Sequence, residues 1–200
     1  MFKLTINFIL LFFISISSSF KLPTLSYNQL SKTLTIKGTG ILRSSNELKG
    51  YLSQAEYVIV EEGFNELGKG VFFNSKMKQI TIPSTVTLIE RNCFEQSELL
   101  ETIIFQPNSH LTTIEEYAFK NCINMKTIQF PKSLKMIAFN KVFEGCDSYI
   151  DIQFEVGSIF QIKEGIIYTD NMKTLVYYQW NTTIEHLTIE NGVEIIGYSE

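Results

Sequence analysis

Hydrophobic residues between Leu111 and Pro131 follow two different rhythms. In LTTIEEYAFKNCINMKTIQFP they are first three or four positions apart, and at the end they are two positions apart, at Ile128 and Phe130. Alternation with a period of two indicates a short β-strand whose successive side chains point to opposite faces. The wider spacing indicates a return path that leads from one strand to the next. The stretch therefore predicts a return path followed by one strand.

The same pattern recurs along the chain. Alternating apolar pairs occur at Val58/Val60, Ile80/Ile82, Ile103/Phe105, Ile128/Phe130, Ile152/Phe154 and Leu187/Ile189. Successive pairs are 22, 23, 25, 24 and 35 residues apart. A unit of this length is too short to bury its own apolar face, so it must stack on copies of itself. We therefore predict a mainly β, right-handed solenoid of short parallel strands stacked coil on coil.

Other positions of the unit predict what fills the interior. An aliphatic residue precedes an aromatic one by about five positions, at Leu67/Phe72, Ile89/Phe94, Ile114/Phe119 and Ile137 with Val142-Phe143. A small residue follows, at Ser75, Ser97, Cys122 and Cys146, and then a larger apolar residue, at Met77, Leu100, Met125 and Tyr149. Because equivalent positions of stacked coils lie above one another, we expect a phenylalanine ladder and a small-residue ladder inside the solenoid.

The segment before the first full unit predicts an N-terminal cap over residues 20–55. Leu34 and Ile36 alternate as in a strand, and Gly38-Thr39-Gly40 is typical of a turn. The stretch from Ser45 to Gln54 predicts a short helix with Ser45 as its N-cap. Such a cap covers strand edges and core that an open solenoid end would expose. The solenoid itself is expected over residues 56–200.

The gap of 35 residues predicts an insertion at about residues 165–179. Two apolar and aromatic runs, between Gly165 and Tyr178, flank Asp170 and Asn171, which accept turn conformations. We interpret them as an inserted β-hairpin. Asn181, in the acceptor motif Asn181-Thr182-Thr183, is a candidate glycosylation site.

Both ends of the sequence carry a prediction. Lys3, an apolar stretch from about Leu4 to Ile16 and three serines predict a signal peptide over residues 1–19, with an uncleaved signal-anchor as the alternative. We therefore expect a secreted or cell-surface protein. At the other end, the sequence stops at Glu200, before the aromatic residue due five positions after Ile196. The last repeat is thus incomplete, which predicts a fragment or an incomplete gene product.

The three cysteines are Cys93, Cys122 and Cys146. A disulfide-stapled domain usually has an even and denser set. Cys122 and Cys146 fall in the same position of adjacent units, and Cys93 falls where Ala118 stands in the next one. We interpret all three as small buried residues, with a bridge between Cys122 and Cys146 as the alternative.

Composition and charge exclude several classes of function. A net charge of −4, with scattered basic residues, argues against nucleic-acid binding, which needs a concentrated basic surface. Neither His110 nor His186 has a partner at metal-ligand spacing, and no motif of a hydrolase, metalloprotease or phosphate-binding loop occurs. We read acid pairs such as Glu115-Glu116 as a solvated surface. The sequence therefore predicts no enzyme, cofactor or metal, and no further membrane span after the N-terminal segment.

The repeat IxxxAFxxCxxLxxIxIP resembles the leucine-rich repeats of BspA-like surface proteins, also called Treponema-type repeats. The resemblance covers roughly residues 33–200 and includes TLTIKGTGIL, which is similar to the start of the family's N-terminal segment. The family's usual glycine after the first isoleucine is present at Gly68 and Gly197 but is Glu90, Glu115 and Ala138 elsewhere. By resemblance, the protein is expected to take part in adhesion to host cells, matrix proteins or other microbes.

Outward-facing residues of the predicted strands form the candidate partner-binding face. They are Tyr57, Ile59, Gln79, Thr81, Thr102, Ile104, Thr127, Gln129, Asp151, Gln153, His186 and Thr188. Solenoid curvature would make them a continuous concave platform, and aromatic or apolar residues on it would anchor a protein or glycan ligand. An ordinary solvated β face is the simpler interpretation, since threonine favours strands.

Two other functions stay open at this point. One is the ectodomain of a surface receptor whose membrane span and signalling part lie beyond Glu200. The other is an enzyme whose catalytic domain lies beyond it. The sequence favours a non-catalytic exported binding protein over both.

Overall fold

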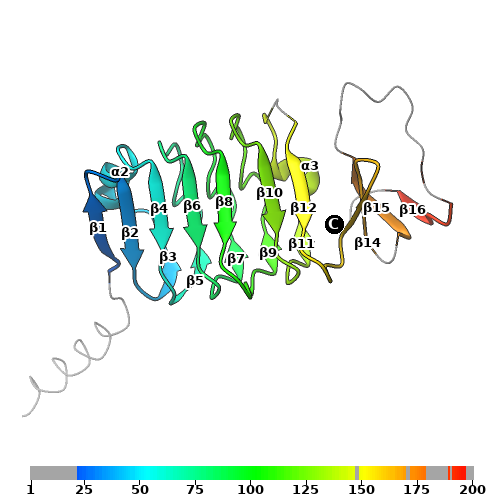
Figure 1. Cartoon of the computed structure of the whole chain (residues 1–200), viewed down its shortest axis with the longest axis horizontal. Coiled ribbons are helices and arrows are strands. Elements are labelled where there is room, and N and C mark those ends of the chain that lie inside the picture. The colour runs from blue at the N-terminus through cyan, green and yellow to red at the C-terminus, as the bar shows by residue number, and fades with distance from the viewer. Residues whose placement is uncertain (1–21, 147–148, 170–171, 179–188, 190, 197–200) are drawn as a thin grey trace, which may run out of the picture.

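The computed structural model describes residues 22–146, 149–169, 172–178, 189 and 191–196. The predicted signal peptide, Asn181, His186 and Thr188 lie outside the described residues. The described chain forms a row of coils that stack side by side, each strand next to the equivalent strand of its neighbour (Figure 1). The predicted mainly β solenoid of parallel strands is confirmed.

One face of the solenoid is built from the predicted strands. They are β2 (Thr33–Lys37), β4 (Tyr57–Val60), β6 (Gln79–Ile82), β8 (Thr102–Phe105), β10 (Thr127–Phe130) and β12 (Asp151–Phe154). From β2 to β8 each strand pairs in parallel with the next, and β10 pairs in parallel with β12. In register, Val58 lies beside Ile80, and Ile80 lies beside Ile103. The two-residue alternation thus turns two apolar columns into the core and two mostly polar columns outward.

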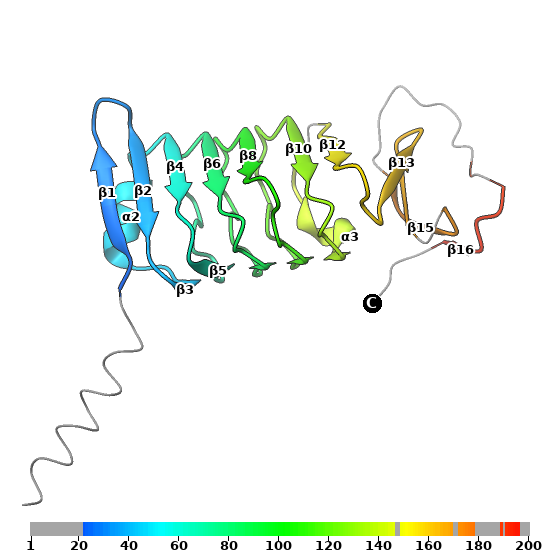
Figure 2. The ribbon, with the colours of Figure 1, turned by 60° about the horizontal axis from the view of Figure 1, so that its bottom comes forward.

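The return path contains a second parallel sheet that the sequence pattern did not predict. Its strands are β3 (Gly40–Leu42), β5 (Phe64–Leu67), β7 (Leu88–Ile89), β9 (Thr113–Ile114) and β11 (Met136–Ile137). In Figure 2, β3 and β5 lie along the lower edge of the ribbon, below the strands of the first sheet. Most of them are too short to alternate recognisably, which explains why the aliphatic position at Ile89 and Ile114 looked like part of an arc.

The arc that carries the phenylalanine ladder is also bonded from coil to coil. The backbone N–H of Phe72 donates to the carbonyl oxygen of Cys93 at 2.9 Å, and that of Phe94 donates to Ala118 at 2.8 Å. Similar bonds repeat in the next coil. Backbone groups that would be orphaned in an isolated arc are therefore satisfied by its neighbour.

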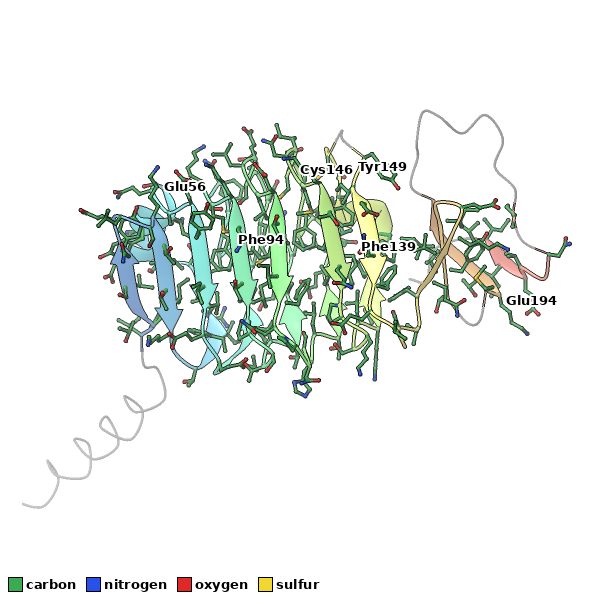
Figure 3. All side chains as sticks on the ribbon, in the orientation of Figure 1. Glu56, Phe94, Phe139, Cys146, Tyr149 and Glu194 are labelled. Carbon is green, nitrogen blue, oxygen red and sulfur yellow. The ribbon has the colours of Figure 1, made fainter. Side chains whose placement is uncertain are left out.

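Stacked phenylalanines fill the interior, as predicted. Ring centroids are 5.2 Å apart between Phe72 and Phe94, 5.3 Å between Phe94 and Phe119, and 5.6 Å between Phe119 and Phe143. All four rings are buried. Each contributes about 1.5–3 kcal/mol by burial, and each stacked pair adds about 0.5–1.5 kcal/mol. Figure 3 shows the side chains that surround Phe94 in this core.

The small-residue ladder is a column of hydrogen bonds, buried at Ser97 and Cys122 and partly buried at Cys146, which is therefore not the fully buried residue that the sequence predicted. Ser97 Oγ donates to the carbonyl oxygen of Phe72 at 2.8 Å. One coil further, Cys122 Sγ donates to Phe94 at 3.2 Å, and Cys146 Sγ donates to Phe119 at 3.1 Å. The three cysteines, all within the described residues, form no disulfide. Serine and cysteine share this position because both are small and both can donate to the previous coil.

The fourth coil departs from the pattern, and one prediction there is wrong. Tyr149, predicted to fill the larger apolar position, is 55% exposed, whereas Ile150 is 3% exposed and takes its place in the core. The same coil has one more residue between Ile137 and Phe143 than its neighbours have. The extra residue allows a short helix, α3 (Phe139–Val142), which brings Phe139 against Phe154 and Phe160.

At the N-terminal end, the predicted helix is confirmed as α2 (Asn46–Leu52), and Ser45 Oγ accepts a hydrogen bond from the N–H of Leu48. Strand β1 (Thr24–Asn28) was not predicted. It pairs antiparallel with β2, and its Leu25 and Tyr27 pack on the core. The segment TLSYN alternates only weakly between apolar and polar residues, so the sequence pattern does not identify this strand.

Beyond the coils, β13 (Gln161–Lys163), β14 (Ile166–Thr169) and β15 (Thr174–Tyr178) pair antiparallel in that order. The predicted hairpin is therefore confirmed, and β13 was missed. Ile167 joins the solenoid core, while Ile166, Tyr168 and Leu175 form a small second cluster. Ile189, predicted to alternate with Leu187, is not part of a strand, and Leu187 lies outside the described residues.

The hairpin takes the place of a coil for the strand that follows it. Strand β16 (Ile195–Ile196) pairs in parallel with β15, and the carbonyl oxygen of Lys173 accepts from the N–H groups of Glu194 and Ile195. The carbonyl oxygen of Thr112 accepts from Lys135 and Met136 in the same way. The backbone pairing from one unit to the next thus continues past the inserted hairpin.

Candidate binding face

The outward side of the first sheet is the candidate site, and we call it the open face. Its residues alternate with buried ones, so Tyr57 and Ile59 point outward on either side of Val58. Pairing aligns Tyr57 with Gln79 and Thr102, and Ile59 with Thr81 and Ile104. The ten predicted residues that the structure describes thus lie on one surface, in two columns: Tyr57, Gln79, Thr102, Thr127 and Asp151, and Ile59, Thr81, Ile104, Gln129 and Gln153.

The two columns also extend over β2, which sequence reasoning did not include. Thr33 aligns with Tyr57, and Thr35 aligns with Ile59. The alternation Thr33-Leu34-Thr35-Ile36 contained the signal, but it was interpreted as a cap strand alone. From β2 to β10 the residues of the two columns are all uncharged.

Three apolar side chains stand out on the open face. Tyr57 is 42% exposed, and Ile59 and Ile104 are each 40% exposed. Between them lie threonines and glutamines, whose hydroxyl and amide groups both donate and accept hydrogen bonds. Toward β12 the polar groups bond to one another, since Gln153 Nε2 donates to Asp151 Oδ2 at 2.7 Å and Thr127 Oγ1 donates to the Asp151 carbonyl at 3.2 Å.

A column of alternating charges borders the open face. One residue before each strand, the chain carries in turn Lys32, Glu56, Lys78, Glu101 and Lys126. Glu56, labelled in Figure 3, pairs with Lys32 and with Lys78, the latter at 2.8 Å. Lys126 pairs with Glu101 at 3.1 Å. Because opposite charges alternate, the three lysines and two glutamates largely offset one another, and the border adds little net field to the open face.

Hydrogen bonds from Lys32 and Lys78 lower the pKa of the Glu56 carboxyl to about 2. The same contact raises the pKa of Lys78. Both residues therefore stay charged across the physiological pH range. As exposed pairs they contribute modestly to stability.

The acid pairs on the return path also connect coils, in addition to being solvated. Glu115 accepts a hydrogen bond from the backbone N–H of Arg91 at 2.8 Å, and Glu90 accepts one from Lys69 at 2.9 Å. Glu116 pairs with Lys141 at 2.7 Å and with Arg91 at 2.6 Å. A glutamate in place of the family's usual glycine thus holds the turn of the preceding coil, and the apolar positions are undisturbed.

Groups that could perform chemistry are dispersed or buried. Within the described residues, no three His, Cys, Asp or Glu side chains gather as they would around a metal ion. Burial raises the pKa of the Cys93 and Cys122 thiols, which disfavours the reactive thiolate. His110 lies with Nδ1 3.1 Å from the carbonyl oxygen of Ser84, at the edge of the coil. No helix in the described part of the chain has the length and apolar character needed to cross a membrane.

Two parallel sheets run along the stack, each coil contributes one strand to each of them, and ladders of matching side chains fill the space between; this arrangement defines a β-solenoid of the leucine-rich-repeat class. The chain belongs to the BspA-type leucine-rich-repeat family: residues 65–195 match the family described as "BspA type Leucine rich repeat region (6 copies)". No curated protein matches the chain.

Solved structures of bacterial proteins have a similar fold. A leucine-rich repeat protein from Eubacterium ventriosum superposes with a TM-score of 0.63 at 19% sequence identity, over 90% of this chain and 60% of its own. The pneumococcal vaccine antigen PcpA superposes with a TM-score of 0.60 at 16% identity, over 88% of this chain and 61% of its own. The alignments thus leave about two fifths of each of these proteins unmatched. At these identities the likeness concerns the fold.

Proposed function

We propose that this protein is exported to the cell surface or secreted, and that it binds a protein or glycan ligand through the open face without catalysing a reaction. One observation carries the proposal: the open face is uncharged from β2 to β10 and exposes Tyr57, Ile59 and Ile104 on a base of threonines and glutamines. Aromatic and aliphatic anchors within a polar surface are typical of recognition sites.

Membership of the BspA-type family supports this proposal. So does the structural likeness to a protein named as a pneumococcal vaccine antigen. The stacked architecture supports it further, since parallel columns make one extended contact surface that each added coil lengthens. The neutral border of alternating charges favours a ligand whose contact surface is itself largely uncharged.

The test compares three variants of the chain on arrays of extracellular-matrix proteins and of glycans. Tyr57→Ala and Ile104→Ser each remove an exposed anchor of the open face. Leu99→Ser is the matched control, because Leu99 is as exposed as Ile104 but lies in the turn before β8.

We expect wild-type binding to one or more array components that weakens about tenfold in each open-face variant, the effect of losing one buried anchor. Leu99→Ser keeps wild-type binding. If every component that binds wild type binds Tyr57→Ala and Ile104→Ser equally well, the open face is not the site.

A further inference from the structure

A shallow pocket lies between the N-terminal cap and the arcs of the first two full coils, away from the open face. It has a volume of about 470 Å³ and is lined by Ser44, Lys49, Lys69, Gly70, Phe73, Asn92 and Glu95. Ser44 precedes α2 and Lys49 lies within it, and α2 occupies the place that an arc takes in later coils. One wall of the pocket is therefore the cap, and its floor belongs to the solenoid.

The pocket exists because Gly70 has no side chain. Gly70 adopts φ +60°, and the equivalent positions of the next two coils, Asn92 and Tyr117, adopt φ +59° and +62°. A Cβ added at Gly70 would meet only Phe73 Cβ, at 3.9 Å. The space above this glycine is thus open, whereas side chains occupy the same position of the later coils.

Phe73 is the second departure from the repeat. It is 42% exposed. The equivalent positions of the next three coils carry charged residues: Glu95, Lys120 and Glu144. A ligand that covers this ring would remove apolar surface from water, which is favourable. Phe73 and Gly70 therefore make one apolar, open position where the repeat otherwise places polar side chains.

Polar groups surround this apolar position. Asn92 Nδ2 donates to Glu95 Oε2 at 2.6 Å, which orients an amide and a carboxylate together at one side of the pocket. Ser44, Lys49 and Lys69 line the remainder. The pocket thus offers donors and acceptors around an aromatic ring, with two positive charges against one negative.

We propose that this pocket binds a single sugar ring that carries a carboxylate. A sugar ring has one face of C–H groups, which packs on an aromatic side chain, and an edge of hydroxyl groups that both donate and accept hydrogen bonds. Phe73 receives the C–H face, and Asn92 and Glu95 bond the hydroxyls. Lys49 and Lys69 pair with the carboxylate. The site is separate from the open face, so it does not depend on the function proposed above.

The experiment titrates the protein with methyl glucuronide and with methyl glucoside, followed by saturation-transfer NMR and calorimetry. Gly70→Asn places a side chain in the pocket, and asparagine is the residue that the next coil already has at nearly the same φ. Tyr117→Asn is the matched control, because it places the same residue in the same position of a coil outside the pocket. Lys49→Gln and Lys69→Gln test the carboxylate.

Wild type and Tyr117→Asn are expected to bind methyl glucuronide saturably, and Gly70→Asn to bind it at least about tenfold more weakly. The two lysine variants are expected to lose most of the preference for the glucuronide over the glucoside. Circular dichroism melting shows whether each variant is folded. Equal binding by wild type and Gly70→Asn, or no saturable binding by wild type, overturns the site. Equal affinity of wild type for both sugars overturns the carboxylate assignment.

Discussion

The rings of Phe94 and Phe119 stack with their centroids 5.3 Å apart, although the two residues belong to different coils. The backbone N–H of Phe94 also donates a hydrogen bond to the carbonyl oxygen of Ala118, the residue before Phe119. Packing and backbone pairing therefore hold the same two coils together at the same place. The loss of one ring should weaken the attachment of both neighbouring coils.

Phe94→Ala should lower the free energy of unfolding by about 3–5 kcal/mol, because it leaves a cavity between Phe72 and Phe119. Urea denaturation measures the change. Phe73→Ala is the control, since it removes an exposed ring one residue after the ladder and should change stability by less than about 1 kcal/mol. Equal effects of the two substitutions would contradict the stacked core.

Ser97→Ala should lower the free energy of unfolding by about 1–3 kcal/mol, since it removes the donor to the Phe72 carbonyl and the partner of Ser75 Oγ at 2.9 Å. Ser97→Cys should cost less, because cysteine serves the same position at Cys122 and makes the equivalent bond there. The two variants are compared by thermal unfolding. If Ser97→Cys is as unstable as Ser97→Ala, the column does not depend on donation to the previous coil.

Acid should weaken the contact between the coils that Glu56 joins. The pKa of Glu56 is lowered from 4.5 to about 2 in the folded protein, so its contribution to stability is complete above pH 4.5 and is lost as pH falls toward 2. Glu56→Gln should reduce the pH dependence of the free energy of unfolding in this range. Salt at 1 M should reduce it too, because it shortens the Debye length to about 3 Å. Urea midpoints from pH 6 to pH 2 measure the effect. If Glu56→Gln keeps the wild-type pH dependence, other carboxylates cause it. One of these is Glu116, whose pKa is lowered mainly by a hydrogen bond from Lys141.

The thiols of Cys93 and Cys122 should resist alkylation in the native protein at pH 8, because burial raises their pKa and blocks access. Mass spectrometry after labelling measures this directly. Unfolding in urea without reductant should then make all three cysteines reactive. A single reactive cysteine would instead indicate a bridge between Cys122 and Cys146.

Much of the fold could be predicted because the repeat occurs several times in the sequence. Errors at one copy are corrected by the others, so the positions of Phe72, Phe94 and Phe119 specify the ladder together. Where a unit differs from its neighbours, prediction failed: Tyr149 was assigned to the core, and Ile150 occupies it. Four steps along the chain separate Cys146 from Ile150, whereas three separate Cys122 from Met125, so a count from the small residue stops one position too early, at Tyr149.

The candidate site was predicted in part for a related reason. Strand alternation fixes which side chains point outward, so the columns through Tyr57 and Ile59 followed from sequence alone. The pocket at Gly70 and Phe73 did not, because it depends on how α2 lies against the first arcs. Both residues nevertheless differ from the residues at the equivalent positions of the later coils. An alignment of the coils would therefore have singled them out.

The carbonyl oxygen of Lys173 accepts hydrogen bonds from the N–H groups of Glu194 and Ile195, and this pairing bears on how the number of units can change during evolution. A hairpin of different length and composition presents the same acceptor to its successor that an ordinary unit presents. New units can therefore be gained, lost or replaced without redesigning the units on either side. The length of the open face can thus be altered by changing the number of units, while each junction between them keeps its chemistry.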